Sequence, residues 1–397
     1  MANASNVAPE GAFGAFGAFG AFTGSGAFGA FGAFGAFGAF GGPGPANPPL
    51  ISQALITNYD GIAGTWNPIT NANAVNPNKE EQTAYLARLA PAVRASIYAL
   101  ELGSRIGFAF EPAATSSDPG WARVFHLSLT AGSSVPDTEY EHLISMRRPT
   151  QDVFIDQLTL VANYADLRQD RMAEILAQLG TPTEFLRAIS FIEPARTPYT
   201  IELLATAHWL ANFVEMRLKY ALACKRPIEY SPQIQPMIWT PSHGSLPSGH
   251  STEAFTMARV LWALLRAAGV KPYSEAVWGT MLMRQAARIA INRTVAGVHF
   301  PVDSAAGATL GLALGEYFTR RCTKKEPSES WAFDGTAYPS TMDFEWRDYF
   351  DTDATNPKQT ETGWVDSKPI PNPSGTPITS EPLDWLWKKA KAEWKDI

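Results

Sequence analysis

The chain of 397 residues has little cysteine, and its basic residues are fewer than its acidic ones. Two cysteines, Cys224 and Cys322, are too few for a disulfide framework or a thiolate metal cluster. Lys and Arg number 32 against 38 Asp and Glu, which gives a formal net charge of −6. This acidic balance argues against broad binding to nucleic acid or anionic membranes, so no nucleic-acid partner is expected.

Long uninterrupted apolar runs are also missing from the sequence. Every long helical segment carries Arg, Lys or Glu within about 20 residues, so no transmembrane segment is predicted. The first nine residues contain no Lys or Arg, which a secretory signal requires near its start. A cytoplasmic location is therefore expected.

Glycine and phenylalanine are concentrated at the N-terminus. Nine of the 22 Phe and 13 of the 31 Gly precede residue 51, in Gly-Ala-Phe repeats. A period of three suits neither a helix nor a strand. Residues 1–49 are therefore predicted to be a low-complexity tail with a Pro/Gly linker. Self-association through Phe, or membrane insertion, is the alternative.

Apolar residues recur at helical spacing from Asn78, a plausible N-cap, to about Arg320. No convincing hairpin or alternating strand–helix pattern is visible. The fold is therefore predicted to be mainly α, a helical bundle formed by residues 50–321. The predicted helices cover residues 79–102, 150–179, 200–224, 251–267, 275–292 and 302–318.

The composition changes in residues 322–397, where six of the 12 Trp lie beyond residue 330. We expect an irregular, Trp-rich segment that packs on the body and ends in a short amphipathic helix. Docking on the same chain is favoured over binding to a partner. The apolar face of this helix comprises Leu383, Leu386, Trp387, Ala390, Trp394 and Ile397.

Three segments together suggest an oxyanion site. Lys219 and Arg226 lie seven residues apart, two turns on a helix, although such a basic stripe alone is usually a solvated face. Ser248, Gly249 and His250 precede an apolar-periodic run. These residues either belong to a helix N-terminus whose free N–H groups bind an anion, or they form an ordinary helix cap.

The third segment runs from Arg293 through His299 to Asp303. If a helix begins near Phe300 or Pro301, the Asp303 carboxylate can hold one ring nitrogen of His299 and leave the other basic. Taken singly, His299 is more typical of a structural histidine with satisfied hydrogen bonds. With the other two segments it completes a site for phosphate or vanadate, in which cations neutralise the oxygens and histidines act on the central atom.

These motifs, in this order, resemble those of type 2 phosphatidic acid phosphatases, class A acid phosphatases and vanadium-dependent haloperoxidases. The resemblance implies that His299 coordinates vanadium or attacks phosphorus. It also implies that His250 is the acid–base residue and that Asp303 orients His299. Oxyanion-binding roles are implied for Lys219, Arg226, Ser248, Gly249, Arg293 and the two histidines. Asn292 departs from the pattern, because phosphatases usually have Ser there.

The surrounding features favour a haloperoxidase of the bacterial type, with a helical fold of that class and vanadate as cofactor. Phosphate can occupy the same site, because vanadate mimics the phosphoryl-transfer transition state. His243 resembles a second histidine near the metal in algal bromoperoxidases and favours bromide or iodide. Met216, however, replaces a Trp found in the eukaryotic enzymes.

The predicted partners are hydrogen peroxide, halide, an organic acceptor and a second copy of the chain in a homodimer. Two other functions stay open. One is a soluble acid phosphatase with a phosphohistidine intermediate. The other is an assembly protein whose working parts are the repeat and the Trp-rich tail.

Overall fold

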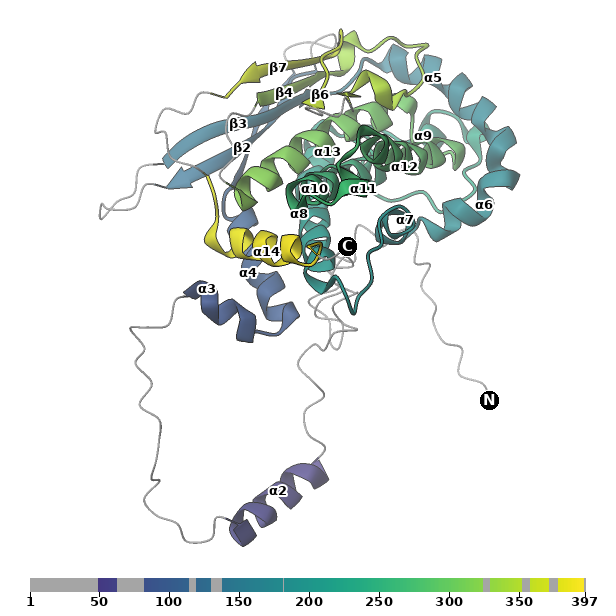
Figure 1. The fold of residues 1–397 in the computed structure, drawn as a ribbon. Coiled ribbons are helices and arrows are strands. Elements are labelled where there is room, and N and C mark those ends of the chain that lie inside the picture. Colours follow the sequence, from purple (N-terminus) through teal and green to yellow (C-terminus); the bar gives the residue numbers. More distant parts are fainter. Residues whose placement is uncertain are drawn as a thin grey trace, which may run out of the picture.

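The computed structural model describes residues 49–62, 82–113, 119–129, 138–180, 182–323, 329–351, 358–370 and 378–395. The predicted repeat tail up to residue 48 and the predicted cap Asn78 lie outside the described residues. The described part is mostly helical, with a five-stranded sheet on one side of the helices (Figure 1).

The longer helices form the body of the molecule. They are α4 (Pro91–Gly103), α5 (Gln151–Asn163), α6 (Arg168–Ala177), α8 (Pro198–Leu222), α10 (Gly249–Ala268), α12 (Ala276–Val295), α13 (Pro301–Cys322) and α14 (Glu381–Ala392). Helix α2 (Pro49–Ile62) lies apart from this body in Figure 1, and its described side chains are exposed. Short helices connect them: α3 (Gln82–Tyr85), α7 (Thr183–Arg187), α9 (Pro227–Tyr230) and α11 (Lys271–Ser274). Single 3-10 turns are η6 (Leu86–Arg88), η7 (Tyr164–Leu167), η8 (Pro232–Ile234), η9 (Gly335–Ala337) and η10 (Trp346–Asp348).

Two predicted helices are interrupted in the structure. The helix predicted over residues 79–102 is split, and α4 starts only at Pro91. Pro91 lacks an N–H, and Ala90 before it is extended (φ −63°, ψ 147°), as the residue preceding a proline prefers. The helix predicted over residues 150–179 is divided by the 3-10 turn Tyr164–Leu167.

The prediction that the fold has no hairpin was wrong. Strands β1 (Ile106–Glu111), β2 (Trp121–Leu129) and β3 (Thr138–Arg147) pair antiparallel in chain order. The core-facing positions of β2 are Ala122, Val124 and His126, whereas outward positions include aromatic and aliphatic residues. The usual alternation of apolar and polar residues is therefore blurred.

The segment after residue 322 contributes to this sheet, where irregular structure was predicted. Strand β4 (Glu329–Asp334) pairs parallel with β3 and antiparallel with β7 (Val365–Pro369), which gives the order β1-β2-β3-β4-β7. A second, two-stranded sheet joins β5 (Phe350–Asp351) to β6 (Lys358–Gln359). The long-range pairing of β3 with β4 could not be predicted from local patterns.

Helix α14 docks on the same chain, as the sequence predicted, with its described apolar face buried. Only Ile397 of the predicted face lies outside the described residues. Just beyond the helix, the Glu393 carboxylate accepts hydrogen bonds from the backbone N–H groups of Tyr199 (2.7 Å) and Thr200 (2.8 Å). Because these N–H groups lie in the first turn of α8, Glu393 caps that helix from a distant part of the sequence.

Helices α10 and α13 lie side by side in close backbone contact. A Cβ added to Gly307 would lie 2.6 Å from the Ser248 carbonyl oxygen, and one added to Gly311 would lie 2.5 Å from the Thr252 carbonyl oxygen. The Ser248 N–H donates to the Asp303 carbonyl at 2.9 Å, which ties the two helix starts together. Glycine is required here because any side chain would push the helices apart.

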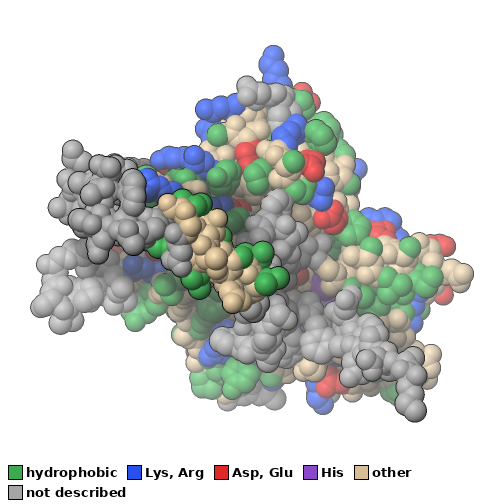
Figure 2. Space-filling model, turned by 90° about the horizontal axis from the view of Figure 1, so that it is seen from below, with side chains coloured by type: hydrophobic (Ala, Val, Ile, Leu, Met, Phe, Trp, Pro, Cys, Tyr) green, Lys and Arg blue, Asp and Glu red, His purple; other side chains and the backbone are tan. Residues whose placement is uncertain are grey.

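The described surface carries mixed charge, and Figure 2 shows basic and acidic side chains intermixed over one face. Within the described residues, none of the helices combines the length and apolar character that a membrane span requires.

We expect Gly311→Ala to lower the free energy of unfolding by about 1–2 kcal/mol, because the overpacking cost exceeds the gain of about 1 kcal/mol in helix propensity. Thermal or urea unfolding measures the change. Gly61→Ala, in the last turn of α2, is the matched control, because a Cβ there meets nothing within 4 Å. Equal stability of the two variants would contradict the close packing of α10 on α13.

Candidate active site

The structure brings the three sequence motifs together at the ends of four helices. Lys219 lies in the last turn of α8, and Arg293 lies in the last turn of α12. His299 and Asp303 flank the start of α13, and His250 lies in the first turn of α10. Helix termini expose free backbone groups, so their convergence forms a polar centre inside a mainly apolar bundle.

Lys219 and Arg226 meet in a different way from the two-turn helical stripe that was predicted. Helix α8 ends at Leu222, and Ala223 takes a left-handed conformation with φ 48°. The chain then turns, so that Arg226 precedes the short helix α9 rather than continuing α8. Both cations nevertheless lie in the interior, each with only 2% of its surface exposed.

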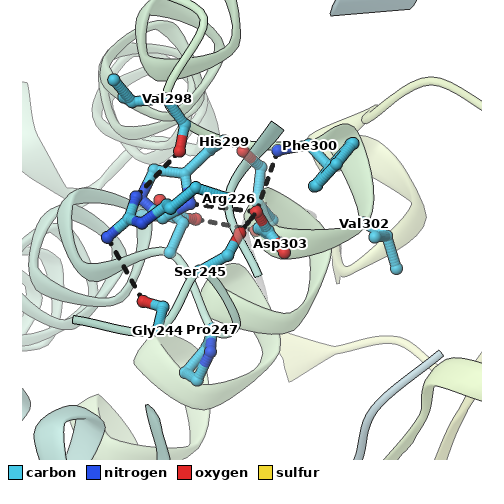
Figure 3. A network of polar contacts seen from close by, with 12 residues as sticks. Arg226, Gly244, Ser245, Pro247, Val298, His299, Phe300, Val302 and Asp303 are labelled. Carbon is cyan, nitrogen blue, oxygen red and sulfur yellow. Dashed lines mark hydrogen bonds and ion pairs between the residues drawn. The ribbon is translucent and has the colours of Figure 1, made fainter. Parts of the chain in front are cut away.

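Asp303 holds the ring of His299, as Figure 3 shows. The carboxylate oxygen Oδ2 accepts hydrogen bonds from His299 Nδ1 at 3.0 Å, from the Phe300 N–H at 2.9 Å and from the Ser245 hydroxyl. Burial raises the pKa of Asp303 to about 6, although the bonds from Ser245 and Phe300 favour the carboxylate. The ring therefore carries its proton on Nδ1 when Asp303 is ionised.

The second ring nitrogen of His299 faces a cation. Arg226 Nη1 lies 2.9 Å from His299 Nε2 and, because a guanidinium can only donate, Nε2 must be the unprotonated nitrogen whose lone pair accepts this hydrogen bond. Burial, followed by the charges of Arg226 and Lys219, holds the pKa of His299 well below its ordinary value. His299 is thus a neutral imidazole with its basic nitrogen inside the cationic centre.

The three cations are held mainly by neutral carbonyl oxygens. Lys219 Nζ donates to the carbonyls of Gly244 and Ser245 at 3.3 Å each, and also to that of Pro247. Burial, with the charge of Arg226, lowers the pKa of Lys219 to about 8. Burial also lowers the pKa values of Arg226 and Arg293 to about 10.

Several donors in this centre have no hydrogen-bond acceptor among the described residues. Arg293 is 1% exposed, yet its Nε and Nη1 lack partners, and so does the Ser248 hydroxyl. Buried donors without acceptors are costly, about 1–3 kcal/mol each, and buried cations need counter-charge. A bound oxyanion would supply both, so the residues present fit phosphate or vanadate.

The start of α10 is open for such an anion. Ser248 is the N-cap residue, but its side chain makes no capping hydrogen bond, contrary to the capping alternative. Ser251 is also engaged elsewhere, since its hydroxyl donates to the Ser304 carbonyl at 2.8 Å. The first N–H groups of α10 and the positive end of its dipole therefore remain available.

Two partly exposed histidines border the buried centre. His250 Nε2 donates to the Gln178 carbonyl at 2.9 Å, and burial together with the charge of Arg293 lowers its pKa to about 4. His243 Nδ1 accepts from Arg226 Nη2 at 3.1 Å, and burial and the charge of Lys219 lower its pKa to about 3. Both imidazoles are therefore neutral at neutral pH.

Sequence reasoning missed Gln178, at the end of α6. Its side-chain oxygen accepts from Arg293 Nη2 at 3.1 Å and from Asn292 Nδ2 at 2.9 Å, while its backbone oxygen binds His250. Asn292, at the position where phosphatases usually have Ser, thus helps to fix the same glutamine. Ser245 and the buried carboxyl of Glu215 were missed too. No spacing pattern points to any of them, because each approaches from a different segment.

The comparison with known protein families gives one match, to the PAP2 superfamily over residues 201–326. A comparison with curated proteins gave no match. Members of the superfamily are enzymes, phosphatases or haloperoxidases, whose site binds phosphate or vanadate. The matched range contains all three motifs and the helix starts that carry them. Residues 201–326 of this chain therefore form a PAP2 superfamily domain.

Proposed function

We propose that the protein is a vanadium-dependent haloperoxidase that uses hydrogen peroxide to oxidise bromide or iodide to a hypohalous acid equivalent. An organic acceptor then takes up the halogen. The observation that carries this proposal is the buried cationic centre, in which unpartnered donors of Arg293 and Ser248 accompany the neutral Nε2 of His299. The proposed catalytic domain is residues 50–321, with residues 322–397 packed on it.

The residues proposed to hold vanadate are those that fit an oxyanion. His299 Nε2 would be the metal ligand, and Lys219, Arg226 and Arg293 would neutralise the oxygens. The Ser248 hydroxyl and the Gly249 N–H would donate to them. Bound vanadate would act as a Lewis acid that activates peroxide toward halide.

His250 is proposed to move the proton that peroxide loses on binding. Its lowered pKa leaves the ring neutral, so it begins the reaction as a base. The Gln178 carbonyl accepts from Nε2 and leaves Nδ1 to take up the proton. A phosphatase would instead require this histidine to begin as an acid and protonate the leaving alcohol.

The second candidate is a phosphatase with a phosphohistidine intermediate. It is favoured by the unprotonated Nε2 of His299 and by the Asp303 carboxylate that keeps the proton on Nδ1. In this reaction Nε2 would form a bond to phosphorus as the ester P–O bond breaks. Water would then hydrolyse the phosphohistidine and release phosphate.

Protein reconstituted with orthovanadate should brominate a phenolic dye in a reaction that requires both bromide and hydrogen peroxide. His299→Ala should reduce the rate to background, whereas His142→Ala, which alters a histidine on β3, should leave it unchanged. Dye absorbance measures the reaction. If bromination is absent and the vanadate-free protein rapidly hydrolyses p-nitrophenyl phosphate, the phosphatase is favoured. If both activities are absent, both proposals are overturned.

Asp303→Asn should lower kcat/KM about 10- to 100-fold in whichever assay is active, because the neutral amide no longer raises the basicity of His299. The substitution is isosteric, so the melting temperature should change little. Steady-state kinetics and thermal unfolding separate the two effects. Unchanged kcat/KM would show that Asp303 has only a structural role.

The catalytic rate should have an alkaline limb near pH 8. Only protonated Lys219 attracts the oxyanion, so kcat/KM should fall about tenfold per pH unit above its pKa of about 8. Lys219→Arg should lower activity but remove this limb, because arginine stays charged throughout. An identical pH profile for this variant would assign the limb to another group.

A further inference from the structure

A buried carboxyl group lies beside the proposed oxyanion site, and none of the motifs includes it. Glu215 precedes Lys219 by one turn of α8 and is 1% exposed. Its Oε2 has no hydrogen-bond partner. Its Oε1 approaches the first residue of α10 so closely that a Cβ on Gly249 would lie 2.6 Å from it. The carboxyl group is therefore aimed at the helix start where an anion would bind.

Another buried carboxyl group, Glu253 on α10, interacts electrostatically with Glu215. Burial alone would raise the pKa of Glu253, but the charge and hydrogen bond of His208 outweigh it and lower the pKa to about 2. His208 Nε2 lies 3.3 Å from Glu253 Oε1, and Asn212 Nδ2 donates to the same oxygen at 3.5 Å. Glu253 is therefore the carboxylate of the pair that carries the negative charge.

Glu215 is the member of the pair that keeps its proton. Burial and then the charge of Glu253 raise its pKa well above the ordinary value, against the opposing charges of Lys219 and Arg226. Two neighbouring carboxyl groups commonly divide in this way, because both cannot ionise in a buried site. The retained O–H then needs an acceptor.

We propose that Glu215 is a further binding residue of the oxyanion site, whose carboxyl group, in its acid form, donates a hydrogen bond to an oxygen of bound phosphate or vanadate. The inference rests on the proposed function, since it requires an oxyanion at the start of α10. It explains why Gly249 has no side chain: the space beside its Cα belongs to the Glu215 carboxyl group.

The proposal makes oxyanion affinity depend on one proton. Ionised Glu215 would place a negative charge against the anion, whereas the acid form places a donor there. The charged and titratable groups around it are Lys219 on α8, Glu253 and His250 on α10, and Arg226 before α9. Of these, only Lys219 titrates near neutral pH. Loss of its charge also weakens anion binding, so the contribution of Glu215 to oxyanion affinity is measured with a variant of Glu215.

The experiment measures the dissociation constant of inorganic phosphate for the full chain by titration calorimetry. Glu215→Ala should weaken binding about tenfold near pH 6, because one hydrogen bond to a charged group is lost. Glu215→Gln keeps a donor in nearly the same place and should bind within about threefold of wild type. Glu184→Gln, which removes an exposed carboxylate of α7, is the control and should match wild type.

The pH dependence provides the second arm. The affinity of Glu215→Gln relative to wild type should rise as the pH passes the raised pKa of Glu215, because only wild type loses the donor by ionisation. The ratio cancels the titration of phosphate, which both proteins share, whereas Lys219 interacts with Glu215 and its titration is followed separately in each protein. This arm needs only the Gln variant, so it remains decisive if Glu215→Ala does not fold.

The outcomes separate this inference from the proposed function. The inference is supported if wild type binds phosphate and Glu215→Gln binds it equally well at low pH. At high pH, Glu215→Gln should bind phosphate more tightly than wild type. Loss of phosphate binding by Glu215→Gln near pH 6, or unchanged binding by Glu215→Ala, would overturn it while leaving the oxyanion site intact. Absence of phosphate and vanadate binding to wild type would overturn the oxyanion site itself.

Discussion

The close approach of α10 and α13 is the constraint on which the candidate site depends. Glycines at positions 307 and 311 let the backbone of one helix touch that of the other. The Ser248 N–H reaches the Asp303 carbonyl at 2.9 Å, so the two helix starts are held in register. The loop that offers an open helix terminus and the loop that offers His299 are thereby fixed side by side. A rigid arrangement of this kind gives electrostatic preorganisation, because the donors are already oriented toward the anion position before the anion binds.

A second constraint is the burial of three cations with few carboxylates nearby. Lys219 and Arg226 bind backbone carbonyls, which satisfy their donors without neutralising their charge. Asp303 is ionised within the same centre, but its hydrogen bonds are directed to His299 and the adjacent backbone. The centre thus remains short of negative charge. Burial and, after it, the neighbouring cationic charges lower the pKa values of the histidines and of Lys219.

The carboxyl groups next to this centre show how burial assigns protons. Glu253 has His208 as a partner and ionises, whereas Glu215 has no such partner and keeps its proton. Asp303 accepts three hydrogen bonds on one oxygen, and its other oxygen has none. Each protonation state is a property of the three-dimensional surroundings, because solvent exclusion and neighbouring charge decide it.

The sequence by itself determined the features that depend on neighbours along the chain. His299 and Asp303, four residues apart across a helix start, meet as their spacing predicts, and α8, α10, α12 and α13 follow the apolar period. The tertiary structure alone decided the rest. The turn that brings Arg226 to His299, the pairing of β3 with β4, and the approach of Gln178 and Glu215 join segments far apart in sequence. Local periodicity carries no information on such contacts, because they form only when separate helices pack and exclude water.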